Sequence, residues 1–390
     1  FKKLEKKGLI RKVKKKYYRG NQYPYFWLTE MGILHALNEG ANPEHLLNQA
    51  LAIYPQNRNL QFFIEAVRAL DSELRLRGSS LFVARGKGSA LIPSLVQTLG
   101  ADLVVSQETV EPGGRARDDT VARALGDRFL RFNGETIHPP GTIRNLHGRA
   151  YGVFTPFSKA WRRDVSHASC VDAPTALPPV LPEVMAQSLG LPEDQEAGAP
   201  GRNPSVLQAG PSVAVARLAR FVRDGATAYK ERRDRLDLDG TSRLSADLRF
   251  GTISPRRVWR TVQEQVPPGS GQTSFENELI WREFAYSTLR DFPSITHDDF
   301  QRDFAGFPWR DDDEAFVAWA EGRTGYPVVD AAARQLRSEG YVHNRARMIA
   351  ASFLTKDLLI DWRRGEAWYR HWLTDGDLAQ NVAEIGRAHV

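Results

Sequence analysis

The first half of the chain alternates between two periods of apolar and polar residues. Apolar residues at steps of three and four predict helices, which we place at 60–76, 90–99 and 115–125. Short runs rich in β-branched and aromatic residues predict strands beside these helices, at 80–84, 101–106 and 128–132. Strands and helices in this order predict a parallel sheet with crossover helices.

The second half of the chain has a different pattern. Residues from Cys170 to Gly210 are rich in Pro, Gly and Ala, which is typical of a linker between domains. From Pro211 onward the pattern is helical, with no convincing strand. We therefore expect an α/β domain at 57–165, a linker at 166–210 and an all-α domain at 211–382.

Residues 1–50 form a separate unit. Phe1 to Gly8 predicts a basic helix that ends at a glycine. Two strands, Leu9 to Val13 and Tyr23 to Leu28, follow, and a Gly-Asn turn at 20–21 joins them. A further helix is expected from Thr29. This order resembles the second half of a winged helix-turn-helix domain, and any other small basic α/β piece is the alternative.

Charge is concentrated in the same unit. Residues 1–19 hold ten Lys or Arg and one acid, so they carry +9, and the rest of the chain carries −3 to reach the total of +6. Such an arm either neutralises nucleic-acid phosphates or is an ordinary solvated charge run. The single cysteine, Cys170, excludes an internal disulfide and a cysteine-rich metal site. With no apolar run of membrane-spanning length and no secretory signal, we expect a cytoplasmic protein.

The first chemical motif is Asp239-Gly-Thr-Ser-Arg-Leu-Ser245. It places three hydroxyls and a guanidinium beside an expected helix N-terminus, which suits a diphosphate. A simple capping box is the alternative. The second motif runs from Glu276 to Phe284, where Glu278, Trp281 and Arg282 share one helix face. These groups are suited to stack on and hydrogen-bond a nucleobase, although a surface ion pair on an amphipathic helix gives the same spacing.

Two further motifs lie near the C-terminal end. On a helix after Gly340, one face carries Asn344, Arg347, Met348 and Ala351. Burying Asn and Arg there requires polar partners, which a ligand would supply. His343 is interpreted as a packed histidine and not as a metal ligand. In Thr374-Asp-Gly-Asp377, the two carboxylates either bind sugar hydroxyls or pair with Arg347, or they belong to a turn with a helix cap.

Together these motifs resemble the DNA photolyase and cryptochrome family over about 57–382. The similarity is carried by six segments in the family's order, at 151–161, 241–245, 277–284, 322–327, 343–345 and 375–377. The branch that looks closest is the bacterial class I cyclobutane pyrimidine dimer photolyases, since Trp281 stands where they stack the lesion. The resemblance implies an α/β part with an incomplete parallel sheet, followed by an all-α domain that binds FAD.

The resemblance also implies roles for individual residues. FAD would be bound by Tyr229, Thr241, Ser242, Arg243, Leu244, Ser245, Asn344, Arg347, Asp375, Gly376 and Asp377. The flipped dimer and the DNA backbone would be contacted by Arg233, Glu278, Trp281, Arg282, Asn344, Arg345 and Met348. Asn381 would lie near the reactive flavin nitrogen, and Trp309 and Trp362 match two members of the family's electron-hopping chain. No metal is implied.

The activity implied is light-driven splitting of cyclobutane pyrimidine dimers in UV-damaged DNA by a monomeric enzyme carrying reduced FAD. An antenna chromophore of the folate or deazaflavin type is left open. Compared with the family, the chain looks truncated at both ends, with 1–50 chimeric and 383–390 outside the family pattern, so we expect impaired activity. Two rival interpretations are a cryptochrome-like photoreceptor without repair and a DNA-binding regulator with a flavin sensor.

Overall fold

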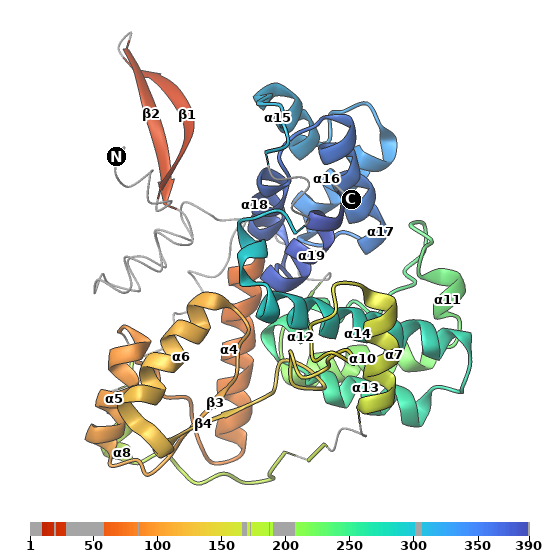
Figure 1. Ribbon diagram of the computed structural model, residues 1–390. Coiled ribbons are helices and arrows are strands. Elements are labelled where there is room, and N and C mark those ends of the chain that lie inside the picture. Colours follow the sequence, from red (N-terminus) through yellow and green to blue (C-terminus); the bar gives the residue numbers. More distant parts are fainter. Residues whose placement is uncertain are drawn as a thin grey trace.

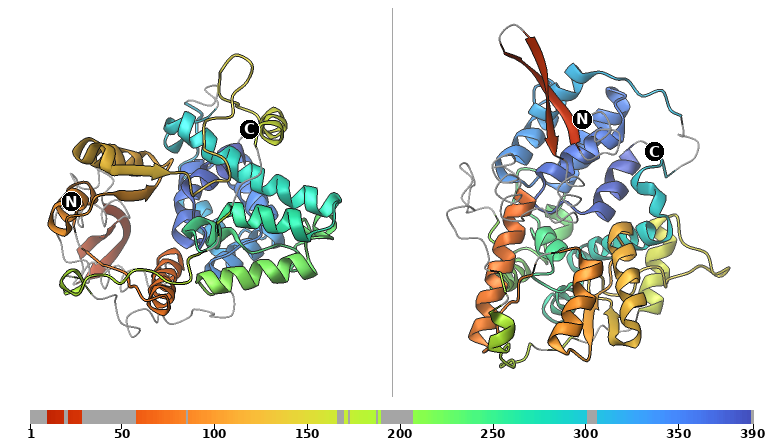
Figure 2. Two further views of the ribbon diagram at one scale, coloured as in Figure 1. Left: turned by 90° about the horizontal axis from the view of Figure 1, so that it is seen from below. Right: turned by 90° about the vertical axis from the view of Figure 1, so that its left-hand side faces the viewer.

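The computed structural model describes residues 10–18, 21–28, 58–84, 86–165, 170–171, 173–186, 188–189, 207–300 and 306–388. In Figure 1 a smaller α/β part and a larger helical part lie beside one another, and helix α4 (Arg58–Leu76) runs between them. Helix α4 contacts α10, α12 and α18 of the helical part. The further views in Figure 2 show the same two parts from below and from the side.

Two strands near the start of the chain form an antiparallel pair. Strand β1 (Ile10–Tyr18) pairs with β2 (Asn21–Leu28), from Ile10 opposite Leu28 to Tyr18 opposite Asn21. The predicted hairpin is therefore confirmed, with a first strand longer than expected. The helices expected at 1–8 and from 29 onward lie outside the described residues, so the winged-helix interpretation stays a prediction.

The α/β part contains the parallel strand pair that the periodicity predicts. Helices α5 (Gly88–Leu99) and α6 (Pro112–Leu125) flank β3 (Val104–Gln107), and β4 (Phe129–Phe132) follows the short 3-10 helix η1 (Gly126–Arg128). Strands β3 and β4 are parallel, with Val104 opposite Phe129. Helix α5 ends where Gly100 adopts a φ of 62°, a left-handed conformation that glycine takes without a steric penalty. The crossover from β3 through α6 to β4 is thus confirmed.

The strand predicted at 80–84 is wrong. This segment has no strand hydrogen bonding, and its backbone bonds to the linker instead. The Val83 N–H donates to Ser188 Oγ at 2.8 Å, and the Leu189 N–H donates to the Val83 carbonyl at 2.8 Å. The segment is extended but joins no sheet. Its backbone groups already have hydrogen-bond partners in the linker, so they do not need to pair with β3. The described part of the linker contains one helical turn, α8 (Pro182–Met185).

The helical part begins after helix α7 (Phe154–Asp164) and the linker. Its elements are α10 (Pro211–Asp224), α11 (Tyr229–Arg232), α12 (Ser245–Phe250), α13 (Pro255–Gln265), α14 (Ser270–Asp291), η2 (Pro293–Thr296), α15 (Asp313–Glu321), α16 (Pro327–Glu339), α17 (Asn344–Ser352), the π-helical turn η4 (Phe353–Asp357), α18 (Trp362–Trp372) and α19 (Leu378–Ala388). No strand occurs in the described residues from 207 onward, as predicted. Helix α19 continues past 382, the limit expected for the domain.

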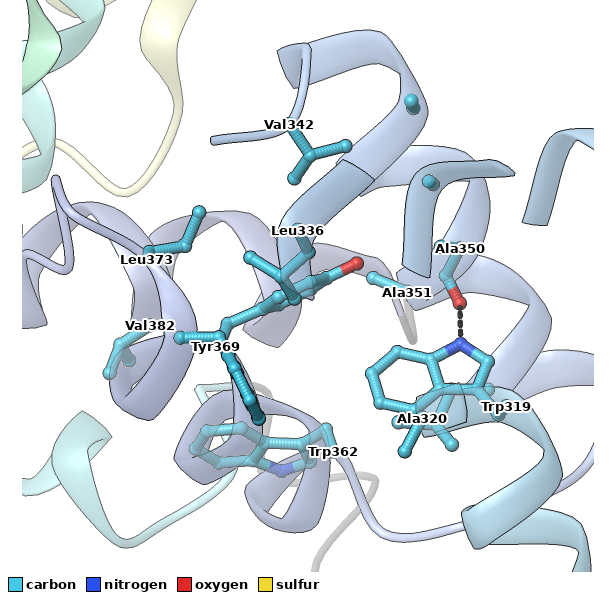
Figure 3. Close-up of a cluster of buried hydrophobic side chains, with 14 of the residues drawn as sticks. Trp319, Ala320, Leu336, Val342, Ala350, Ala351, Trp362, Tyr369, Leu373 and Val382 are labelled. Carbon is cyan, nitrogen blue, oxygen red and sulfur yellow. Dashed lines mark hydrogen bonds between the residues drawn. The ribbon is translucent and has the colours of Figure 1, made fainter. Parts of the chain in front are cut away.

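Helix α14 is the centre of the helical part. One core cluster includes Phe275, Ile280 and Phe284 of this helix, and a second includes Ala285 and Leu289. Because the helix is buried on several sides, its apolar residues do not form a single stripe. Figure 3 shows the second cluster, in which the Trp319 Nε1–H donates to the Ala350 carbonyl at 2.8 Å.

Among the helices of the described residues, none combines the length and the apolar composition that a membrane crossing requires.

Candidate functional site

A polar cavity lies where α11, α12, α14 and α17 meet the loop before α19. Its volume is about 190 Å³, and it is open to solvent on one side. Residues from five sequence segments line it: Tyr229, Ser242, Leu244, Ser245, Leu248, Arg249, Phe275, Glu278, Leu279, Arg282, Arg347, Asp375, Asp377 and Gln380. The structure thus brings together residues of the motifs at 239–245, 276–284, 340–348 and 374–377.

The most buried charged pair in the cavity wall joins Arg347 to Asp375. Arg347 Nη2 lies 2.9 Å and 2.7 Å from the two carboxylate oxygens, and Arg347 Nε donates to the Val342 carbonyl at 2.9 Å. Arg347 is 8% exposed and Asp375 is 7% exposed. A buried charge needs a partner of this kind, and the predicted pairing of these two residues is confirmed.

Asp377 lies in the same loop and has different partners. The Tyr286 hydroxyl donates to Asp377 Oδ2 at 2.6 Å, and the Gln380 N–H donates to Oδ1 at 3.0 Å. The carboxylate therefore also caps the start of α19, so the helix-cap interpretation of this motif is correct as well. Arg282 donates to the Tyr286 hydroxyl at 3.0 Å, which continues the network to α14.

Arg249 is a cavity residue that the sequence interpretation missed. Its Nε donates to the Gly376 carbonyl at 3.2 Å, and its Nη2 donates to Glu111 Oε1 at 3.0 Å. Burial opposes its charge, but Asp377 and Glu111 outweigh that effect and raise its pKa. Arg249 follows Ser245 by four residues on the same helix, so helical spacing is the signal that points to it.

Glu135 also lies close to this network and was not predicted. Burial raises its pKa to about 7, and the carboxylates of Asp377 and Glu111 act in the same direction. The Glu135 backbone carbonyl accepts a hydrogen bond from Arg282. Its position between 133 and 138, on the segment after β4, carries no motif that would identify it in the sequence.

Glu278 forms an ion pair at the mouth of the cavity. Its carboxylate bonds to Arg233, and burial raises the pKa of Glu278. Arg233 also lies 5.7 Å from the ring centre of Tyr229, a cation–π distance. The partner of Glu278 thus lies outside α14, and Arg282 bonds to other groups, so the two residues do not form the ion pair on one helix face that the spacing allowed.

The segment before α12 contributes hydroxyls and one unusual backbone conformation. The Thr241 and Tyr341 hydroxyls are 3.1 Å apart, and the Arg243 guanidinium lies 4.4 Å from the Tyr341 ring centre. Arg243 has a φ of 53°, which is uncommon for a non-glycine residue. Leu244 is the N-cap of α12 and makes no side-chain capping bond, so the capping-box alternative is wrong. The Ser242 and Ser245 side chains line the cavity.

Trp281 does not line the cavity, although it lies on α14 between Glu278 and Arg282 in sequence. Its ring stacks on Phe154 at the start of α7, with ring centres 3.6 Å apart and an angle of 5° between the planes. It also meets Phe284 edge to face at 5.9 Å. The expected common face of the three residues is therefore divided, because Trp281 packs toward α7 while its two neighbours turn to the cavity.

The four residues expected on one face of α17 are divided as well. Arg347 lines the cavity and Ala351 is buried in the core, whereas Met348 is 46% exposed. Met348 lies with Arg345 in a second, open groove of about 570 Å³. Asn344, the first residue of α17, lines neither hollow. A helix turn of 100° per residue separates these side chains more than their shared motif suggests.

Asn381 and the two expected electron carriers lie deeper in the helical part. Asn381 is 2% exposed, and its Nδ2 has no hydrogen-bond partner within the described ranges. Trp362 is 1% exposed and donates from Nε1 to Asp299 at 2.7 Å. Trp309 is partly buried against the core cluster that contains Trp362, and it packs on Phe307 at 4.5 Å.

His343 is a helix cap. Its Nδ1 accepts a hydrogen bond from the Arg345 N–H at 3.1 Å, at the start of α17. Burial lowers the pKa of His343, which favours the neutral ring that this bond requires. The part of the chain with described coordinates contains no cluster of three or more side chains suited to a metal ion.

The donors and acceptors of the cavity suit a large polar ligand with both anionic and heterocyclic groups. Arg249, Arg282 and Arg347 supply cationic donors, while Asp375 and Asp377 supply acceptors for amide or hydroxyl hydrogens. The unpaired amide of Asn381 is a further buried donor.

Comparisons with known proteins agree with this description. The family described as "DNA photolyase" matches residues 35–180, and the family described as "FAD binding domain of DNA photolyase" matches residues 275–388. The deoxyribodipyrimidine photo-lyase of Agrobacterium fabrum is 37% identical over 328 residues, which cover 82% of this chain and 68% of the relative.

Two solved structures have the same fold. A class III photolyase from Agrobacterium tumefaciens matches with a TM-score of 0.79 and 33% identity, over 85% of this chain and 70% of the other. A cryptochrome from Synechocystis matches with a TM-score of 0.76 and 28% identity, over 85% and 71%. The chain belongs to the DNA photolyase family, and its helical part contains the FAD-binding domain of that family. The similarity to class I photolyases in particular stays a prediction.

Proposed function

We propose that this protein binds FAD in the cavity and repairs cyclobutane pyrimidine dimers in UV-damaged DNA under blue light. The observation that supports this proposal most is the convergence of Arg249, Arg347, Asp375 and Asp377 on one cavity, because the last three lie in the region that matches the FAD-binding domain. The relatives named deoxyribodipyrimidine photo-lyase support the reaction. We also propose that the enzyme is a monomer with domains at 57–165 and 211–382.

Different residues of the site would bind different parts of FAD. The Ser242 and Ser245 hydroxyls would donate to the phosphates of FAD. Tyr229 and Leu244 line the same wall, and Thr241 and Arg243 of the adjoining segment would complete the site. Arg347, Asp375 and Asp377 would hold the polar edges of its rings, and Asn344 and Gly376 would complete that side. The free amide of Asn381 would donate to a flavin nitrogen. Bound FAD in its reduced form supplies the electron that opens the dimer and takes it back.

The mouth of the cavity would receive the damaged nucleotides after they leave the DNA duplex, at a cost that is lower for a damaged base pair. Glu278 and Arg282 would hydrogen-bond the bases there, with Trp281, Asn344 and Met348 around them. Arg233 and Arg345 would contact DNA phosphates, for which both would exchange their present carboxylate partners. Trp362 and Trp309 would carry electrons between the cavity and the surface.

The experiment is a two-stage assay on the purified protein. Bound FAD is first measured by its visible absorbance, and the reduced protein is then illuminated with an oligonucleotide that contains one cyclobutane thymine dimer. We expect loss of the dimer in blue light and none in the dark. An R347M variant should lose FAD, and R260M, which changes an exposed arginine, should not. Retention of FAD by R347M, or absence of light-dependent repair by the FAD-loaded protein, would contradict the proposal.

A second candidate function is FAD photoreception without repair. The position of Trp281 favours it, because one face of this ring is covered by Phe154 and the residue does not line the cavity. The structural similarity to a cryptochrome is consistent with it. The same assay separates the two functions, since a photoreceptor would change its flavin spectrum in blue light and leave the dimer intact.

A further inference from the structure

The loop that carries Asp375 and Asp377 is held in part by a residue that does not line the cavity. The Asn59 side chain, at the start of α4, donates from Nδ2 to the Thr374 carbonyl at 3.1 Å and to the Gly376 carbonyl at 3.5 Å. Asn59 does not line the cavity, whereas Asp375 and Asp377 do. Along this loop, therefore, the carbonyls of 374 and 376 turn to Asn59 while the side chains of 375 and 377 turn inward.

A second contact reaches the Gly376 carbonyl from α12, and the α/β part supports it through Glu111. Arg249 donates to the Gly376 carbonyl at 3.2 Å and is itself held by Glu111, the N-cap residue of α6, at 3.0 Å. The loop is also tied to the end of α16, because the Thr374 N–H donates to the Gly340 carbonyl at 2.8 Å. The peptide groups that precede Asp375 and Asp377 thus have fixed partners.

There is little free space where the start of α4 meets Gly340 and Thr374. A methyl group in place of the Gly340 hydrogen would lie 2.6 Å from Thr374 Oγ1 and 2.6 Å from Arg58 Cγ. Arg58, beside Asn59, donates to the Ser338 carbonyl at 2.9 Å and so anchors the same end of α4. A side chain held in a tight junction keeps its direction, which a hydrogen-bonding group needs in order to orient another group.

We infer that Asn59 is a positioning residue for the Asp375 and Asp377 carboxylates, an inference that rests on the proposed binding of FAD in this cavity. Fixing the peptide planes that precede Asp375 and Asp377 sets the direction in which each carboxylate leaves the backbone. An asparagine amide suits this position because it supplies hydrogen-bond donors to both carbonyls and adds no charge beside the two carboxylates. The start of α4 thereby belongs to the cofactor site, although 315 residues separate Asn59 from Thr374.

The test uses the full chain, stripped of flavin and titrated with FAD. The N59D variant keeps the shape of the side chain, removes both donors and places carboxylate oxygens against two carbonyl oxygens. We expect its dissociation constant for FAD to rise by about tenfold, the effect of roughly one lost hydrogen bond with its partner left unpaired. The matched control is N145D, because the recorded bonds of Asn145 are accepted by its oxygen and survive the change.

Two further measurements separate positioning from a general loss of structure. The visible circular dichroism of bound flavin should change in N59D and stay the same in N145D, because this signal reports the surroundings of the flavin. The E111Q variant acts through Arg249 at a half-exposed position that tolerates substitution, and it should raise the dissociation constant about two- to threefold.

The outcomes are distinguishable. If the unchanged protein binds FAD, and N59D and E111Q bind it with the same affinity and the same dichroism, the inference is overturned while the proposed function stands. If N59D does not fold, N59A, which removes the amide without adding a charge, takes its place, and an unchanged affinity in N59A overturns the inference. If the unchanged protein does not bind FAD, the proposed function fails, and the inference fails with it.

Discussion

Removing the carboxylate of Asp375 should destabilise the protein strongly, because it leaves the Arg347 guanidinium buried without its charged partner. The two side chains are 6% and 10% exposed, and their shortest contact is 2.7 Å. Breaking a buried ion pair on one side costs about 3–5 kcal/mol. Arg347 keeps its hydrogen bond to the Val342 carbonyl. We therefore expect D375A to lower the free energy of unfolding by about 3 kcal/mol, near the lower end of this range.

The assay is urea denaturation of the FAD-free protein, followed by far-ultraviolet circular dichroism. D375A should lower the urea concentration at the midpoint, and a second change, R347M, should restore part of the loss, because it removes the unpaired charge and leaves an apolar side chain of similar length. The control is E264Q, which removes an exposed ion pair on α13 and should change stability by less than about 0.5 kcal/mol. A loss in D375A as small as in E264Q, or a double variant less stable than D375A, would refute the reasoning.

Burial raises the pKa of Glu135 to about 7 from an ordinary value of 4.5, so the free energy of unfolding should fall as the pH rises between these values, where the unfolded chain loses its proton first. The E135Q variant should reduce this dependence on pH only in part, because Glu283 titrates in the same range and remains. Urea titrations that give the same pH slope for E135Q and the unchanged protein would contradict this. G340A should cost about 1–3 kcal/mol, because Gly340 has a φ of 65° and no room for a methyl group; an unchanged thermal midpoint would count against this packing. Phe154→Leu should cost about 0.5–1.5 kcal/mol through loss of the stack with Trp281, whereas Phe154→Tyr should cost little, and equal denaturation curves for the two variants would rule the stack out as a source of stability.

Local patterns predicted those elements whose stability depends on nearby residues. The helix at 60–76 and the crossover between β3 and β4 were predicted from periodicity alone. The segment at 80–84 has the same kind of composition as β3 but is not a strand. A strand exists only with a neighbour to receive its hydrogen bonds, and which neighbour is available is not a property of the segment.

Local patterns also predict the arrangement of the cavity only in part. The ion pair of Arg347 with Asp375 was among the alternatives that the two motifs left open, since an arginine and an aspartate near one ligand are natural partners. The different directions of Trp281 and its neighbours on α14 were not predicted. Helical spacing gives the angle between side chains but not which of them faces a cavity and which faces another helix.

The sequence by itself determined the order of helices and strands, the basic arm and the motifs that identify the family, because these depend on residue types at short spacings. Only the tertiary structure decided that Asn59, Glu111 and Glu135 lie around the loop of Asp375 and Asp377. Residues so far apart in the chain meet through the packing of α4 and α6 on the helical part. No periodicity records such contacts, since they arise from how whole elements fit together.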